Sequence, residues 1–175
     1  MKIYMIKILV CFSIVDNTDD VLRSDWEILS KDNLSIDYTQ KIINPYDESA
    51  IEYALRIKDT ASESGMTVHI TAVTIGQSLK DIIFKNLFAV GVDRIVLLKN
   101  SSQNMFDPDS TSRILENFIN SERFDMVFLG QQNSITCSGQ TAARLSVYLD
   151  LPYTGYIADM ELIGDKLRVK CKTRA

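Results

Sequence analysis

The stretch IKILVCF, residues Ile6–Phe12, is a nearly continuous apolar run that is followed by Ser13. A strand that is buried on both faces of a parallel sheet has this pattern, whereas a strand with one solvated face alternates between apolar and polar residues. The stretch therefore predicts a strand near the middle of a parallel sheet.

Three further apolar runs repeat this pattern along the chain: TVHITAVT at Thr67–Thr74, RIVLL at Arg94–Leu98 and MVFL at Met126–Leu129. Apolar residues recur at helical spacing between and after the runs, in Pro45–Ser64, after Gly76, around Ile114–Ile119 and in Ala142–Leu149. Strands that alternate with helices indicate βαβ units, and right-handed crossovers leave few topologies for them. We therefore expect an α/β fold with an open, mostly parallel twisted sheet and helices on both faces.

Two segments depart from this alternation and predict small β-hairpin excursions. The polar segment 16–43 contains Trp26–Ile28 and Ile36–Tyr38, which indicate a small hairpin or excursion. Near the end of the chain, Ala158–Ile163 and Lys166–Cys171 flank Gly164-Asp165, which is a typical hairpin turn.

Length and composition limit the possible classes of protein. The 175 residues, of which 46% are apolar, suffice for one globular domain over 1–175 and are too few for two ordinary ones. The net charge of −4 argues against a nucleic-acid partner, because phosphate binding needs clustered Lys and Arg. The longest wholly apolar run, Ile8–Phe12, is too short to span a membrane, and Lys7 interrupts any signal-peptide core.

The cysteine and histidine content gives no indication of a catalytic or metal site. The three cysteines, Cys11, Cys137 and Cys171, lack CxxC spacing, so we expect a cytoplasmic protein without a disulfide framework or zinc. The single histidine, His69, lies inside a predicted strand, where a structural role is expected. Cys11 ends a buried strand and has no evident histidine to activate it.

The candidate ligand site lies at the carboxyl ends of the predicted strands. In an open parallel sheet, ligands bind there, at the point where the strand order reverses. The turns at these ends are Cys11-Phe12-Ser13, Thr74-Ile75-Gly76 and Gly130-Gln131-Gln132. Three largely polar turns suit a nucleotide, although every α/β sheet has turns of this kind.

Two predicted helix starts lie next to these turns. In Asn44-Pro45-Tyr46-Asp47-Glu48, Asn44 suits the N-cap, Pro45 the first helical position and Asp47 the first turn. These residues either only start a helix or also hold a ligand.

The polar loop QQNSITCSGQT, Gln131–Thr141, leads directly into another predicted helix. Backbone N–H groups at that helix start, together with the hydroxyls of Ser138 and Thr141, can cradle a phosphate. The loop is neither GxxxxGK[ST] nor GxGxxG, so the P-loop and dinucleotide fingerprints are absent. An ordinary polar loop with a Ser or Gly cap remains the alternative.

Four longer stretches match the motifs of one known family. KILVCFSIVD (7–16) matches KILVxxKxVxD, and NPYDESAIEYALRIKD (44–59) matches NPFDExAVEEAxRLKE, the most specific of the four. Residues 73–98 match a strand, a glycine turn, a helix and the strand motif AxGADRxxxL, and residues 128–152 match LGxQAIDDDxxQTGxxxAxxLxxP. The chain thus resembles the β subunit of electron-transfer flavoproteins, including the FixA-like members.

The resemblance implies a cofactor and partners as well as a fold. The fold is Rossmann-like, of the adenine nucleotide alpha hydrolase-like type. The partners are an electron-transfer flavoprotein α subunit, which forms a heterodimer and holds most of the FAD, and a dehydrogenase such as an acyl-CoA dehydrogenase. The β subunit itself holds AMP in ordinary members, or a second FAD in electron-bifurcating members, and carries electrons without bond chemistry of its own.

The residues that match the family's nucleotide site lie in the turns that the strand-end argument selects. They are Cys11, Asn44, Pro45, Tyr46, Asp47, Ile75, Gln132, Ile135, Ser138, Gly139, Gln140 and Thr141.

The chain departs from the family pattern in two ways. Ile135-Thr136-Cys137 replaces the acidic triplet of the last loop, and Ala142 replaces the glycine that follows Gln140-Thr141. These changes predict a nucleotide that is bound weakly, differently or not at all. The sequence also stops at Ala175, before the family's docking loop and the arm that embraces the α subunit, so we expect a fragment or a shortened protein.

Two other functions agree with the same residues. The chain can be a free-standing adenine-nucleotide-binding regulatory domain of universal-stress-like architecture, which acts by binding alone. It can also be a structural subunit with an empty site.

Overall fold

A computed structural model describes residues 5–22, 28–30, 33–34, 38–100, 107–164 and 166–172. Four parallel strands form the central sheet: β1 (Met5–Cys11), β6 (Thr67–Gly76), β7 (Arg94–Lys99) and β8 (Met126–Leu129). Their order is β7-β6-β1-β8, so β1 lies in the interior, as its apolar sequence predicts. The chain builds outward from β1 through β6 to β7 and then returns to the other side of β1, which makes β1/β8 the point where the strand order reverses.

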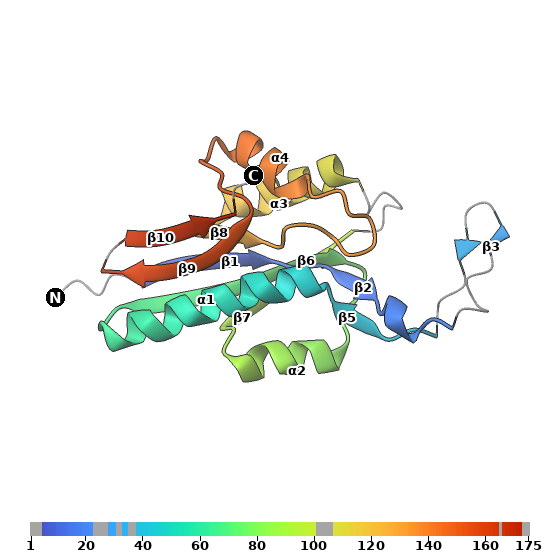
Figure 1. Cartoon of the computed structure of the whole chain (residues 1–175), viewed down its shortest axis with the longest axis horizontal. Coiled ribbons are helices and arrows are strands. Elements are labelled where there is room, and N and C mark those ends of the chain that lie inside the picture. The colour runs from blue at the N-terminus through green and yellow to red at the C-terminus, as the bar shows by residue number, and fades with distance from the viewer. Residues whose placement is uncertain are drawn as a thin grey trace.

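Helices cover both faces of this sheet (Figure 1). They are α1 (Pro45–Glu63), α2 (Asp81–Val90), α3 (Pro108–Ser121) and α4 (Thr141–Leu149). In β1, Ile8 and Val10 belong to the core cluster with α1 and α2, whereas Leu9 packs with Leu115 and Leu145 of α3 and α4. Successive side chains of a strand point to opposite faces, so one apolar strand supplies both cores. The predicted fold class is confirmed.

The C-terminal hairpin forms as predicted, from β9 (Ile157–Ile163) and β10 (Lys166–Cys171) in antiparallel register. It packs on the α1 side of the sheet, where Met160 and Leu162 join the core with α1. The hydroxyl of Tyr53 in α1 donates a hydrogen bond of 2.9 Å to the carbonyl oxygen of Ala158. These contacts attach the hairpin to the domain.

The segment between β1 and α1 contains an antiparallel ladder that the sequence analysis missed. Strand β2 (Ile14–Asp16) pairs with β5 (Lys41–Ile43), and a short 3-10 turn, η1 (Thr18–Asp20), follows β2. Strands β3 (Ile28–Ser30) and β4 (Asn33–Leu34) form a second small ladder. The predicted pairing of Trp26–Ile28 with Ile36–Tyr38 lies mostly outside the described residues. The β2–β5 ladder brings Asn44, which follows β5, next to the end of β1.

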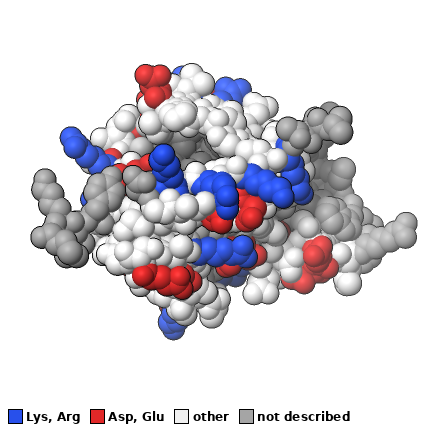
Figure 2. All heavy atoms as spheres, turned by 60° about the vertical axis from the view of Figure 1, so that its left-hand side comes forward, with Lys and Arg blue, Asp and Glu red and all other residues white. Residues whose placement is uncertain are grey.

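Charges of both signs lie side by side on the end of the molecule that Figure 2 brings forward. Ion pairs at 2.7 Å join Lys58 to Asp93 and Arg94 to Glu122. Within the described part of the chain, no helix has the length and apolar character that a membrane span needs. The same residues contain no group of three or more His, Cys, Asp or Glu side chains able to hold a metal ion.

Candidate functional site

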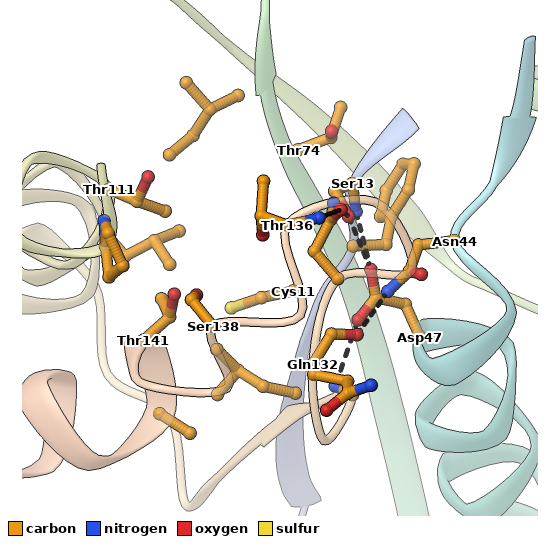
Figure 3. A pocket seen from close by; sticks show the side chains of 18 of the residues that line it. Cys11, Ser13, Asn44, Asp47, Thr74, Thr111, Gln132, Thr136, Ser138 and Thr141 are labelled. Atoms are coloured by element: carbon orange, nitrogen blue, oxygen red, sulfur yellow. Dashed lines mark hydrogen bonds between the residues drawn. The ribbon is translucent and has the colours of Figure 1, made fainter. Parts of the chain in front are cut away.

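A cavity of ≈ 160 Å³ lies at the carboxyl ends of β1, β6 and β8, beside the point where the strand order reverses (Figure 3). The starts of α1, α3 and α4 contribute to its wall. Most of the residues predicted for the ligand site line this cavity, although they come from distant segments: Cys11, Asn44, Asp47, Ile75, Gln132, Ser138, Gly139 and Thr141. The structure therefore brings the predicted turns together in one place.

The other predicted site residues lie outside the cavity wall. Tyr46 lines a larger neighbouring cavity of ≈ 730 Å³, and its hydroxyl accepts a hydrogen bond of 3.2 Å from the Gln132 side chain. Ile135 is 43% exposed on the loop. The side-chain oxygen of Gln140 accepts from the Arg144 guanidinium, and Pro45 is the first residue of α1. These four residues therefore do not contribute to the wall of the smaller cavity.

The carboxylate of Asp47 joins three segments, and we call this arrangement the Asp47 junction. Its Oδ2 accepts hydrogen bonds from the backbone N–H of Ser13 at 2.8 Å and from the Ser13 hydroxyl at 2.9 Å. Its Oδ1 accepts from the backbone N–H of Gly130 at 3.1 Å. Burial raises the pKa of Asp47, while these hydrogen bonds partly oppose the shift. The junction fixes the ends of β1 and β8 against the first turn of α1.

Gly130 allows the close approach on which this junction depends. A Cβ atom at this position would lie 2.3 Å from Oδ1 of Asp47 and 2.6 Å from the carbonyl carbon of Tyr46. Both distances are far below van der Waals contact, so any other residue would push β8 and α1 apart. Glycine at this position is a steric requirement of the site.

Asn44 occupies the N-cap position of α1, but its side chain does not cap the helix. The side-chain Nδ2 donates to the carbonyl oxygen of Gln132 at 2.9 Å, and Oδ1 accepts from the backbone N–H of Ser134 at 3.0 Å. The expectation of a side-chain N-cap is therefore wrong. The loop offers a carbonyl and an N–H that satisfy both halves of the amide, whereas a cap would use only one. Asn44 is 1% exposed, so these bonds are shielded from water.

The loop between β8 and α4 is held by its own hydrogen bonds. Oδ1 of Asn133 accepts from the backbone N–H groups of Ile135 at 2.9 Å and Thr136 at 3.1 Å, and the carbonyl oxygen of Asn133 accepts from Cys137 N–H at 2.9 Å. Cys137 and Gly139 have positive φ angles of 52° and 57°. Sequence reasoning missed Asn133, although asparagine is a common turn former through this type of bond.

The helix starts around the cavity differ in their electrostatic character. At α3, the Asp107 side chain accepts from the N–H groups of Asp109 and Ser110, so that helix start already has a carboxylate. At α4, the N-cap residue Gln140 makes no side-chain cap, and Thr141 lines the cavity. A helix N-terminus carries partial positive charge. An anionic group is therefore best placed at α4.

The cavity wall is otherwise nearly neutral. Of the described residues that line it, none is Lys, Arg or His. Burial and the neighbouring Asp47 carboxylate raise the pKa of the Cys11 thiol far above its usual value, so this cysteine stays protonated. A protonated, buried thiol is inert as a nucleophile. The site has the chemistry of ligand binding through amides and hydroxyls.

An open parallel sheet with a cavity beside its reversal point is the architecture in which α/β proteins typically bind their ligands. The family model "Electron transfer flavoprotein domain" matches residues 34–175. The chain is 34% identical over 139 residues to the electron transfer flavoprotein subunit beta of Bacillus subtilis. This match covers 78% of this chain and 52% of that protein. It is 29% identical over 163 residues to the electron transfer flavoprotein subunit beta of Clostridium acetobutylicum, and this match covers 93% of this chain and 60% of that protein.

A third relative is the acryloyl-CoA reductase electron transfer subunit gamma of Anaerotignum propionicum, which is 33% identical over 132 residues, 74% of this chain and 48% of that protein. The chain belongs to the electron transfer flavoprotein family, and the relatives are mainly its β subunits. The resemblance drawn from the sequence motifs is thereby confirmed. The chain spans about half the length of the curated relatives it matches.

Proposed function

We propose that this chain is the nucleotide-binding part of an electron transfer flavoprotein β-subunit-like protein. It binds AMP or FAD in the strand-end cavity and supports electron transfer from a dehydrogenase together with an FAD-bearing α subunit. The observation that carries the proposal is the convergence of Cys11, of Asn44 and Asp47, and of the loop through Thr141 on one cavity. The chain itself performs no bond chemistry, because in a cofactor protein the cofactor carries out the chemistry and the protein supplies binding and orientation.

The geometry supports one orientation of the nucleotide. The phosphate lies at the start of α4, where the hydroxyls of Ser138 and Thr141 line the cavity and the helix has no side-chain cap. The Asp47 carboxylate and the Asp107 cap make the starts of α1 and α3 unfavourable for a second negative charge. The nucleoside then extends toward the ends of β1 and β6.

The size of the cavity favours AMP over FAD. Ligand pockets for drug-sized molecules usually measure about 300–1,000 Å³, and the cavity of ≈ 160 Å³ is smaller than this range. A mononucleotide is the smaller of the two ligands, and part of it would extend from this cavity into solvent. A flavin needs additional space, for which the adjacent cavity of ≈ 730 Å³ across the loop is the nearest source.

The binding experiment is calorimetry with AMP and with FAD, preceded by mass spectrometry of any nucleotide released on denaturation. Thr141→Val should weaken AMP binding, because it removes a hydroxyl at the start of α4 with little change of shape. Thr60→Val is a matched control on the exposed part of α1, where the hydroxyl only bonds the Arg56 carbonyl oxygen. A folded wild-type protein that releases no nucleotide and binds neither ligand contradicts the proposal.

The electron-transfer experiment mixes the chain with an acyl-CoA dehydrogenase that its substrate has reduced. Absorbance should show no flavin reduction with the chain alone, and reduction should appear when an α subunit and a full-length β subunit are added. Rapid reduction of flavin bound to this chain alone would contradict the assignment of the shuttle flavin to the α subunit. AMP binding without association with any α subunit would favour the regulatory-domain alternative.

A further inference from the structure

The loop between β8 and α4, which we call the cavity loop, is held by two asparagine side chains. Asn44 of the α1 start bonds its first half, as described above. Asn133 bonds its second half, because its Oδ1 accepts from the backbone N–H groups of Ile135 at 2.9 Å and Thr136 at 3.1 Å. Thr136 lines the smaller cavity. The shape of this part of the cavity wall therefore depends on the Asn133 side chain.

The other end of the Asn133 amide reaches the Asp47 junction. Its Nδ2 donates to the hydroxyl oxygen of Ser13 at 3.4 Å, and that hydroxyl donates its own hydrogen to Asp47. In Figure 3, Ser13 and Asp47 lie on the α1 side of the site. The contact thus joins the cavity loop to a junction that is 120 residues away in the sequence. Because both ends of the amide are engaged within the protein, Asn133 acts on a ligand through the loop.

Both partners of this contact depart from the family motifs. In LGxQAIDDDxxQTG, alanine stands at the position of Asn133, and the three acidic residues that follow are replaced in this chain. In KILVxxKxVxD, lysine stands at the position of Ser13. Alanine has no polar side-chain atom, so the bonds of Asn133 are specific to this chain. Charged residues were lost from both segments, and a neutral amide–hydroxyl contact now joins them.

We propose that Asn133 is a positioning residue, which orders the cavity loop and ties it to the Asp47 junction. This inference rests on the proposed function, because the ordered loop places Thr136 and the following Ser138 at the cavity. An asparagine side chain suits this role, since its oxygen accepts from the backbone while its NH₂ group donates elsewhere. Removing the amide should release the loop and weaken binding, while the two hydrophobic cores remain intact.

The first test measures solvent exchange of backbone amides by NMR in the ligand-free chain. In Asn133→Ala, the N–H groups of Ile135 and Thr136 lose their acceptor and should exchange about tenfold faster. Asn133→Asp keeps an oxygen acceptor and should exchange within about threefold of the wild type. Asn120→Ala is the matched control, because Asn120 is exposed on α3 and does not line the cavity. Unchanged exchange in Asn133→Ala, or fast exchange in Asn133→Asp, would overturn the proposal.

The second test measures AMP binding by calorimetry, together with urea unfolding of the same variants. If the loop keeps its binding arrangement in only about a tenth of the molecules, the apparent Kd rises about tenfold. We expect this rise in Asn133→Ala, with the urea midpoint of the wild type, and no change of either quantity in Asn120→Ala. A urea midpoint that falls in Asn133→Ala would indicate a general structural role and would overturn the positioning role.

The third test combines Asn133→Ala with Ser13→Ala, which removes the hydroxyl but keeps the bond from the Ser13 N–H to Asp47. If Asn133 is tied to the junction through this hydroxyl, the double variant should exchange within about threefold of Asn133→Ala alone, because the effects of contacting residues do not add. Effects that multiply would show that the loop and the junction are independent, and would overturn the tie.

These outcomes separate the inference from the proposed function. A wild-type protein that binds neither AMP nor FAD would defeat the proposed function, and the ligand step of this inference with it. Wild-type AMP binding that is unchanged in Asn133→Ala would defeat the inference alone.

Discussion

Replacing Asp47 with asparagine tests the Asp47 junction, because the substitution keeps the shape of the side chain and changes one oxygen into an amide group. Both carboxylate oxygens accept backbone N–H groups, Oδ2 from Ser13 and Oδ1 from Gly130. An asparagine in either orientation therefore places its NH₂ against one of these donors. One buried N–H loses its acceptor, and two donors face each other.

The size of the effect follows from the buried donor. Leaving a buried N–H unsatisfied costs about 1–3 kcal/mol. Loss of a negative charge from the first turn of a helix adds about 0.3–1 kcal/mol. Burial raises the pKa of Asp47, which shows that the ionised form is penalised, so removing the charge offsets part of the loss. We expect Asp47→Asn to lower the free energy of unfolding by about 1–3 kcal/mol.

The measurement is urea unfolding of the ligand-free protein, followed by circular dichroism. Asp81→Asn is the matched control, because Asp81 also lies in the first turn of a helix, α2, but its side chain is exposed. The control should lose no more than about 0.3–1 kcal/mol, the dipole contribution alone. If Asp47→Asn and Asp81→Asn have the same stability, the three hydrogen bonds do not hold the junction together.

Two other substitutions test the site and the sheet. Asn44→Ala removes the bonds to Gln132 and Ser134 and should lower stability by about 1–2 kcal/mol and weaken AMP binding; unchanged urea unfolding and AMP affinity would show that Asn44 does not hold the loop. Burial pushes the pKa of Asp93 up, but hydrogen bonds from the Ile70 N–H and Lys58 outweigh it and hold the pKa below its usual value. The ionised Asp93 carboxylate therefore stabilises the fold above about pH 3.9, the pKa of Asp in the unfolded chain, and this stabilisation is lost as the pH falls through the lower pKa of the folded state. When the free energy of unfolding is measured at decreasing pH, Asp93→Asn should lose less of it than the wild type. Equal losses in the two proteins would contradict this assignment.

The sequence predicts the sheet because its strands have a strong local signal. The apolar runs of β1, β6, β7 and β8 appear where the structure places these strands, and α1 begins at Pro45 as its N-terminal residues indicate. The β2–β5 ladder was missed because its strands have only three residues each and pair across a long polar segment. Such a ladder pairs residues that are far apart in the sequence. A strand of three residues is also too short to show a periodic pattern of apolar and polar residues.

Parts of the candidate site could be predicted only as members of turns. The local sequence places Asn44 at a helix start, but its side-chain partners lie 88 and 90 residues away. The bond between Gly130 and Asp47 spans 83 residues. Local patterns contain no information on these partners, so the sequence indicates the turns in which these residues lie but not the side-chain contacts that they make.

The divergent loop keeps its framework while its charge changes. Ile135, Thr136 and Cys137 stand where the family motif has three acidic residues, yet the loop is held by Asn133, Asn44 and backbone groups. The side chain of Ile135 is exposed, the Cys137 thiol donates to the carbonyl oxygen of Ser134 at 3.7 Å, and Thr136 alone of the three lines the smaller cavity. If the phosphate binds at the start of α4, as proposed, the loss of acidic side chains from this loop reduces the repulsion of an anion there. In the proposed orientation, the replacement removes negative charge near the phosphate, and Thr136, which lines the cavity, is the replaced position that can contact the ligand.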